Sequence, residues 1–309
     1  ARNYIVMAPG LAEELDRMVT VEGGIKDHKG AFLLTAVSTH PANLFSPLCA
    51  LFVPYVDVVP MEQEIPRGID MGKYLRIMEK MMEESQMVAK AVALKRLGYS
   101  FQVSTDVKVE EVLRGSPLVG KVMEGDSIVE VDGRPVRTAQ ETVQAIQDRK
   151  VGEPVSLTIR RDMNTFTVSI RTVRHMENRN KAAVGVIISP HIDYSFPMKI
   201  RIDARDIKGS SAGMMFSLEI LDQLTPGGLA KGHIIAGTGT IDIDGKVGPI
   251  AGVEQKVVAA ERRGAEIFFA PLENAALARK AARRVKVVPV RTLDDAVDFL
   301  CQTARSPRS

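Results

Sequence analysis

Residues 101–173 form a β-rich stretch in the middle of the chain, flanked on one side by a strong helical pattern. Within it, the run from Arg114 to Val136 places Gly-Ser-Pro, Gly-Asp and Asp-Gly turn signals between short apolar segments. A short helical segment at 139–148 and two strand runs at 155–160 and 165–173 follow. Such a stretch is long enough to bury a small hydrophobic core of its own. Because a chain of 309 residues has room for two domains, the sequence predicts a self-contained module beside a second domain.

The segments on either side of this stretch mix helices with strands, which predicts an α+β fold. Apolar runs at 31–37 and 51–59 indicate strands. From Asp70 to Leu97 apolar residues recur at three- and four-residue spacing, which predicts a long helix that ends at Gly98. The last third alternates strand runs with helical runs: strands at 183–189, 198–202, 267–270 and 285–290, and helices at 214–224, 253–263 and 293–301.

Composition and motif content exclude several classes of function. Lysine and arginine number 41 and aspartate and glutamate 38, a net charge of +3 spread along the chain, so nucleic acid is not an expected partner. The five histidines lie far apart and form no zinc-hydrolase motif, so no metal is expected. The nearest phosphate-loop candidate, from Gly239 to Lys246, has five residues between its glycines instead of four, and Val247 stands where a hydroxyl should be. We therefore expect no ATP hydrolysis and no cofactor.

The sharpest local feature is Gly-Ser-Ser-Ala-Gly at 209–213, which satisfies G-x-S-x-G. In that arrangement the small neighbours allow a tight turn, and Ser211 stands exposed at the start of the helix that continues through 214–224. Backbone N–H groups at this helix end could hold a developing oxyanion. A flexible loop that merely caps the helix is the alternative interpretation.

A serine nucleophile needs a base. The only later histidine is His233, and the acids between it and Ser211, Glu219 and Asp222, lie on the helix that follows the serine. A Ser-His-Asp triad therefore fails on spacing. Lys256 is the remaining candidate because small apolar residues flank it on its helix face, where burial would lower its pKa. A surface lysine that extends its amine into water is the alternative.

The β-rich stretch resembles a PDZ domain of the kind attached to bacterial proteases. The resemblance rests on the spacing of Gly115-Ser116-Pro117, Gly120, Gly125-Asp126, Ile128, Val131 and Gly133. It implies a small barrel with an exposed strand edge, to which an extended peptide can add as a further strand. The family's carboxylate-binding loop is usually glycine-rich, whereas the segment expected to supply it, Gly98 to Asp106, holds one glycine. A spacer or lid without a ligand is the alternative role for this module.

The C-terminal third resembles the proteolytic domain of Lon proteases. The resemblance rests on Ser211 within Gly-Ser-Ser-Ala-Gly and on the segment from Gly237 to Lys256, and it covers residues 183–302. In that family a serine and a lysine form a Ser-Lys dyad, and these positions fall on Ser211 and Lys256. The threonine that supports the lysine falls on Thr238.

The whole-chain pattern is similar to the PDZ-containing Lon-like serine proteases of bacteria (the YlbL-like group). This implies a Lon-type proteolytic domain made of residues 1–98 and 176–305, with an inserted PDZ-like domain at 99–175. It also implies an ATP-independent endopeptidase that acts on unfolded proteins or exposed peptides and forms a homo-oligomer. An N-terminal membrane helix ahead of residue 1 would tether the catalytic domain to the outer side of the bacterial cell membrane.

The chain departs from the Lon pattern at several positions. Ser210 replaces a proline, and Lys199 and Arg201 replace histidines on the strand before the serine. Lys208 stands where the family often has an acid, and it would either alter substrate preference or help to lower the pKa of Lys256. Two other functions stay open: a peptide-binding scaffold with an inactive protease domain, and a hydrolase of small esters or amides.

Overall fold

The computed structural model describes residues 4–26, 29–43, 46–65, 69–176 and 178–303. The ends of the expected protease domain, residues 1–3 and 304–305, lie outside the described residues. The chain divides into two compact units, one formed by residues 1–100 together with 196–309 and the other by residues 101–195. The α+β prediction is confirmed, because both units combine helices with strands.

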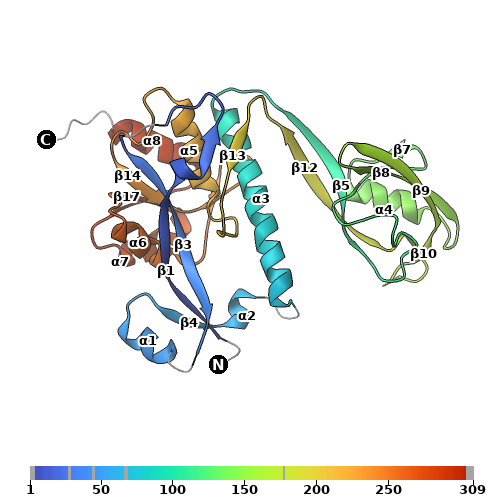
Figure 1. Ribbon diagram of the computed structural model, residues 1–309, viewed down its shortest axis with the longest axis horizontal. Coiled ribbons are helices and arrows are strands. Elements are labelled where there is room, and N and C mark those ends of the chain that lie inside the picture. Colours follow the sequence, from blue (N-terminus) through green and yellow to red (C-terminus); the bar gives the residue numbers. More distant parts are fainter. Residues whose placement is uncertain (1–3, 27–28, 44–45, 66–68, 177, 304–309) are drawn as a thin grey trace. The chain divides into compact units, whose positions relative to one another are not determined.

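The first unit is built on a mixed six-stranded sheet (Figure 1). Its strands, in spatial order, are β18 (Lys286–Val290), β17 (Ile267–Pro271), β14 (Ile234–Gly237), β3 (Ala31–Pro41), β1 (Tyr4–Glu14) and β4 (Asp57–Pro60). The strands β3, β14, β17 and β18 are parallel, whereas β1 is antiparallel to β3 and β4. Ala31 of β3 pairs with Ile234 of β14, so segments from before and after residues 101–195 share one sheet.

Helices cover both faces of this sheet. On one face, α6 (Val253–Arg262) and α7 (Ala275–Ala281) pack on Phe268 and Ala270 in one buried cluster. The intervening residue Phe269 points to the other face, where its ring meets Phe299 of α8 (Leu293–Thr303) edge to face. Alternate residues of a strand point to opposite faces, so the unbroken apolar run in β17 follows from its burial on both sides.

The longest helix, α3 (Met71–Arg96), packs against α5 (Gly213–Leu224) in the same unit. Asp70 caps its start by accepting a hydrogen bond from the N–H of Lys73. Gly98 follows its end with φ +79°, and the N–H of Tyr99 reaches back to the carbonyl of Leu94. The predicted helix with its glycine stop is therefore confirmed.

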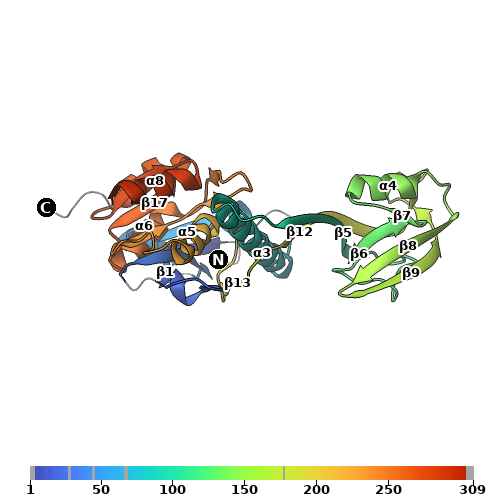
Figure 2. The ribbon, with the colours of Figure 1, turned by 90° about the horizontal axis from the view of Figure 1, so that it is seen from above.

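The second unit is a β-rich module whose strands follow the order β12-β5-β6-β8-β9, with β7 paired to β6. Figure 2 shows helix α4 lying against this sheet, where Ile146 joins a buried cluster with Val109, Leu157 and Ile159. The elements are β5 (Gln102–Val112), β6 (Ser127–Val131), β7 (Arg134–Pro135), α4 (Ala139–Gln147), β8 (Pro154–Arg161), β9 (Asn164–Arg171), β10 (Val173–Arg174), β11 (Ala182–Ala183) and β12 (Val186–Ser195).

The smaller elements complete the first unit. The short strand β2 (Val19–Val21) pairs with β13 (Ile200–Ile202), and β15 (Thr240–Ile241) pairs with β16 (Val247–Gly248). The remaining helical turns are η1 (Leu15–Arg17), α1 (Ser46–Phe52), α2 (Met61–Glu64) and η2 (Leu272–Asn274). Over the described ranges, the structure contains no helix with both the length and the apolar character needed to cross a membrane.

Two expectations differ from the structure. The sequence predicts one strand over 51–59, but α1 ends at Phe52 and β4 begins at Asp57, with Pro54 between them unable to donate a backbone hydrogen bond. The second compact unit begins close to the expected boundary at residue 99 but ends at 195 rather than 175. The reason is that β12 pairs with β5 along its whole length.

Candidate active site

Ser211 lies in a tight turn directly before α5. Gly209 has φ +90°, a conformation that glycine adopts without strain. At Gly213, a Cβ atom would come within 2.7 Å of the Oγ of Ser85 and 2.8 Å of the Cγ2 of Ile241. The two glycines of the G-x-S-x-G pattern are thus required by backbone conformation and by close packing, respectively. The pattern predicts a serine turn at the start of a helix, and the structure places it there, with Ser211 half-buried instead of exposed.

Lys256 lies in the first turn of α6 and points to this serine. Its Nζ lies 2.7 Å from the Oγ of Ser211 and 3.0 Å from the Oγ1 of Thr238. Its side chain is 4% exposed, so the alternative of a solvated surface lysine is wrong. The helix can begin close to Ser211 because Gly252, its N-cap, adopts φ +69°, and the N–H of Lys256 donates to the carbonyl of Gly252.

Burial makes the Lys256 amine easier to deprotonate. Burial lowers the pKa of Lys256 from 10.5 to about 8, because a charged ammonium loses its hydration in the interior. Lys208, for which the sequence left open a role in substrate preference or in lowering this pKa, forms an ion pair with Glu79 of α3. Burial therefore supplies the shift in the Lys256 pKa.

Thr238 follows β14 and lies between the other two residues. Its side chain is 1% exposed, and its hydroxyl donates to the carbonyl of Ser211 at 3.1 Å. The N–H of Gly239 donates to the same carbonyl at 2.9 Å. The structure thus brings together all three residues singled out by the sequence.

Two backbone N–H groups of the nucleophile turn have no acceptor within the described part of the chain, namely those of Ser211 and Ala212. Both stand at the N-terminus of α5, a helix of 12 residues whose dipole favours negative charge there. A tetrahedral oxyanion next to the Oγ of Ser211 could accept hydrogen bonds from this end of the turn.

Other polar candidates have different partners. His233 contacts the carboxylate of Glu266 at 2.8 Å. The basic side chain that contacts the Ser211 hydroxyl is that of Lys256. Among the described residues, no three His, Cys, Asp or Glu side chains gather in a way that could hold a metal ion.

The segment expected to supply a carboxylate-binding loop has a different structure. Residues 102–106 are paired with 191–195 in the β5–β12 ladder, so they do not form the expected carboxylate-binding loop. β12 is one of the two edge strands of this path, β9 being the other; it follows the segment Ala182–Gly185 and contacts α4. Gly185 there has φ +72° and packs on Ser116.

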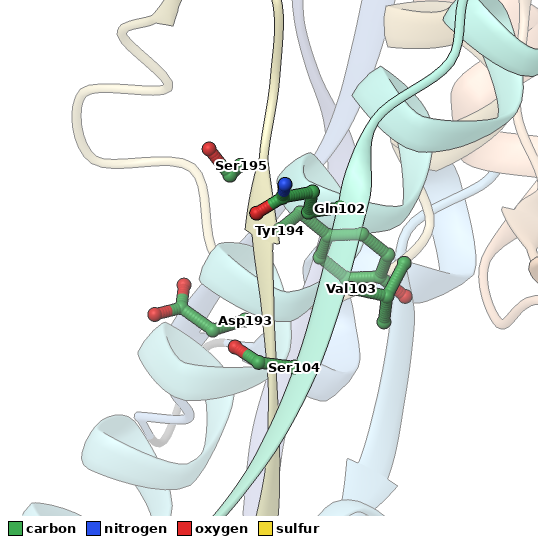
Figure 3. A pocket seen from close by; sticks show the side chains of 6 residues that line it. All are labelled: Gln102, Val103, Ser104, Asp193, Tyr194 and Ser195. Atoms are coloured by element: carbon green, nitrogen blue, oxygen red, sulfur yellow. The ribbon is translucent and has the colours of Figure 1, made fainter.

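A pocket of about 390 Å³ lies on the β5–β12 ladder of the second unit (Figure 3). Its lining residues come from the two paired strands: Gln102, Val103, Ser104, Asp193, Tyr194 and Ser195. Asp193 is the one charged side chain in this lining.

Comparison with known proteins agrees with both units. Residues 95–172 match the PDZ domain family, and residues 193–302 match the Lon protease (S16) C-terminal proteolytic domain. The Lon protease of Chloroflexus aggregans is 34% identical over 101 residues, which cover 31% of this chain and 12% of that protein. Lon protease 2 of Bacillus subtilis is 31% identical over 107 residues, which cover 35% of this chain and 18% of that protein. This chain thus spans less than a fifth of the length of either relative.

Solved structures also resemble the second unit. The PDZ domain of the SdrC-like protein from Listeria monocytogenes is 23% identical, over 26% of this chain and 85% of that one, with a TM-score of 0.25. The two family matches show a PDZ domain together with a proteolytic domain in one chain. Residues 193–302 match the Lon C-terminal proteolytic domain, and the matches together support a Lon-like serine protease.

Proposed function

We propose that this chain is an ATP-independent serine endopeptidase that uses Ser211 and Lys256 as a Ser-Lys dyad. The observation that carries the proposal is the 2.7 Å contact between the Nζ of Lys256 and the Oγ of Ser211. It is supported by the burial that lowers the pKa of Lys256 to about 8, which makes a neutral amine available near neutral pH.

Peptide cleavage by this pair runs through an acyl-enzyme. Neutral Lys256 takes the proton of the Ser211 hydroxyl while the Oγ bonds to the carbonyl carbon of the substrate, and the carbonyl oxygen becomes an oxyanion beside the Ser211 and Ala212 N–H groups. The Lys256 ammonium then gives its proton to the leaving nitrogen as the C–N bond breaks. Water attacks the resulting ester, passes a proton to Lys256, and the serine leaves by taking that proton back. Thr238 would keep the Lys256 amine directed at the Ser211 hydroxyl through its 3.0 Å contact with Nζ.

The proposal that ATP plays no part rests on the sequence, which has no phosphate-binding loop of the required spacing. Without an unfoldase, the substrates we propose are unfolded proteins or exposed peptides. The edge strand β12 supports a role for the PDZ domain in substrate binding or gating, because an extended peptide can pair along it. Pro190 within β12 has no N–H to donate, which would limit how far such a peptide pairs.

Homo-oligomerisation and tethering at the outer side of the bacterial membrane belong to the same proposal. Both rest on the similarity of the whole-chain pattern to PDZ-containing Lon-like proteases. Light scattering of the purified chain would test the first, and fractionation of cells that express the full gene would test the second.

The central experiment is digestion of unfolded casein without ATP by the parent chain, Ser211→Ala and Lys256→Ala in parallel. Cleavage by the parent alone supports the dyad. Cleavage that persists in either variant would mean that another nucleophile or a contaminant is at work. Peptide binding that survives Ser211→Ala, with no turnover by the parent, would favour a peptide-binding scaffold instead. Competition between casein and small esters would reveal a broader hydrolase.

A further inference from the structure

Helix α3 contacts each of the three residues that precede Ser211. The Lys208 amine pairs with the carboxylate of Glu79. The N–H of Gly209 donates to the carbonyl of Met78 at 2.9 Å. The carbonyl of Ser210 accepts a hydrogen bond from the hydroxyl of Ser85 at 3.1 Å. The nucleophile turn is thus held on its α3 side one residue after another.

The contact made by Ser85 differs from the other two because its donor is a buried polar side chain. Ser85 lies in the middle of α3 and is 6% exposed. A mid-helix serine usually bonds a carbonyl of its own helix or points to water, whereas this hydroxyl crosses to Ser210. Burying a hydroxyl without a partner is costly, so the Ser210 carbonyl is what stabilises a polar residue at this position.

The contact fixes the orientation of a peptide group next to the nucleophile. All peptide bonds of the described chain are trans, so the carbonyl of Ser210 and the N–H of Ser211 point in opposite directions. The same carbonyl also accepts a hydrogen bond from the N–H of Gly213 in α5 at 3.3 Å. With the carbonyl held toward α3 by Ser85, the N–H of Ser211 is turned away from that helix. The next carbonyl, that of Ser211 itself, is held by Thr238 and Gly239. The peptide group before Ser211 is therefore anchored by Ser85 and Gly213, and the one after it by Thr238 and Gly239.

We propose that Ser85 is a positioning residue that holds the Ser211 N–H in place as an oxyanion donor. This rests on the proposed function, since it assigns a task within the acyl-transfer step. Ser85 touches neither substrate nor the Oγ of Ser211; it acts through the Ser210–Ser211 peptide. Removing an oxyanion donor outright lowers kcat by about 10²- to 10³-fold, and loss of its anchor should cost less because the N–H stays present.

The test is Ser85→Ala in the full chain, assayed with unfolded casein and with a peptide spanning the main casein cleavage site mapped for the parent. We expect kcat for the peptide to fall about tenfold with KM little changed.

Two inhibitors separate transition-state from ground-state binding. An aldehyde that copies the acyl side of that site forms a tetrahedral adduct with Ser211, and its Ki should rise in step with the fall in kcat/KM. The matching alcohol forms no adduct, and its Ki should not change.

Ser217→Ala is the matched control. Ser217 is also fully buried between α5 and α3, where its hydroxyl bonds the carbonyls of Ala89 and Gly213, and it makes no hydrogen bond to the Ser210–Ser211 peptide. The two variants remove the same group from the same helix pair. We therefore expect a similar fall in Tm in both, but a fall in kcat only in Ser85→Ala. The pH midpoint of kcat/KM should be the same in both variants and the parent, since neither side chain contacts Lys256.

An unchanged kcat in Ser85→Ala would overturn the inference, as would an equal loss in Ser217→Ala or an aldehyde Ki that stays constant. Failure of the proposed function looks different, because the parent chain itself would then leave casein and the peptide intact. That outcome would remove the inference together with the proposal on which it rests.

Discussion

Thr238 donates its hydroxyl proton to the backbone carbonyl of Ser211 at 3.1 Å, across a sequence separation of 27 residues. Because that proton is committed to the carbonyl, the Oγ1 faces the Nζ of Lys256, 3.0 Å away, as an acceptor. One buried hydroxyl thus fixes both the backbone of the proposed nucleophile and the amine of the proposed base. The threonine is in this way a structural link within the proposed dyad.

Replacing Thr238 by valine should separate these two effects. The change keeps the shape of the side chain but removes an acceptor from a buried amine. Since that acceptor favours the charged form, its loss should move the pKa of Lys256 down and the acid limb of kcat/KM to lower pH. The plateau rate should fall about tenfold because the lysine loses its alignment. Thr238→Ser, which retains the hydroxyl, is the control and should stay close to the parent; a valine variant with the parent's rate and pH midpoint would contradict this role.

The proposed base predicts a definite pH profile. Burial lowers the pKa of Lys256 to about 8, and only the neutral amine can accept the proton of Ser211. The logarithm of kcat/KM should therefore rise with unit slope below about pH 8 and level off above it. Initial rates of peptide cleavage between pH 6 and 10 measure this, with Tm followed at each pH. A rate that is flat over this range would count against a lysine base.

Burial of Lys256 also lowers the stability of the folded chain at neutral pH, and it makes that stability depend on pH. In the unfolded chain the pKa of Lys256 returns to its ordinary 10.5, whereas it is about 8 in the folded chain. Between these values the unfolded state binds the extra proton, so stability should rise with pH through this window. The full effect corresponds to about 3 kcal/mol, because one pKa unit is worth about 1.4 kcal/mol.

Lys256→Met isolates this contribution. Methionine fills the buried space without a titrating group, so the variant should be more stable than the parent at pH 7 and lack this part of the pH dependence. The measurement is urea unfolding of both proteins at several pH values between 7 and 10.5, taking the difference between them so that other titrating groups cancel. A difference that does not shrink as pH rises would show that Lys256 is not desolvated in the folded chain.

The turn that carries Ser211 is predicted from local sequence, whereas Lys256 and Thr238 are assigned by the resemblance to Lon proteases. The G-x-S-x-G turn needs small residues at fixed positions, so a short sequence pattern is enough to predict it. The long helix α3 is predicted by its apolar periodicity and by the cap residues Asp70 and Gly98. Burial of Lys256 is a different matter. The apolar face of α6 is compatible with a buried or a solvated amine, and only the packing of α6 against the sheet decides between them.

Long-range pairing is what the sequence could not supply. The role of Ser85 depends on a contact with Ser210 across 125 residues, and nothing near position 85 marks it. The same holds for the edge strand of the PDZ domain. Which strand is exposed depends on β12 returning to pair with β5, and local patterns carry no information on pairing partners between distant strands.

The glycines at the two ends of α6 provide the last prediction. Gly252 and Gly264 have similar left-handed conformations, with φ +69° and +84°. A Cβ at Gly252 would lie 2.6 Å from the Cγ2 of Val37, whereas one at Gly264 meets nothing within 4 Å. Gly264→Ala should therefore lower the free energy of unfolding by only about 1–2 kcal/mol, the cost of the backbone conformation.

Gly252→Ala adds a clash to the same backbone cost, and it displaces the turn that carries Lys256, whose N–H donates to the Gly252 carbonyl. We expect a larger loss of stability than in Gly264→Ala and, at a temperature where both variants are folded, loss of peptide cleavage in Gly252→Ala alone. Urea unfolding and peptide assays at that temperature measure the two effects. Equal stability losses would mean that Val37 moves aside, and full activity in Gly252→Ala would show that the position of Lys256 does not depend on the start of α6.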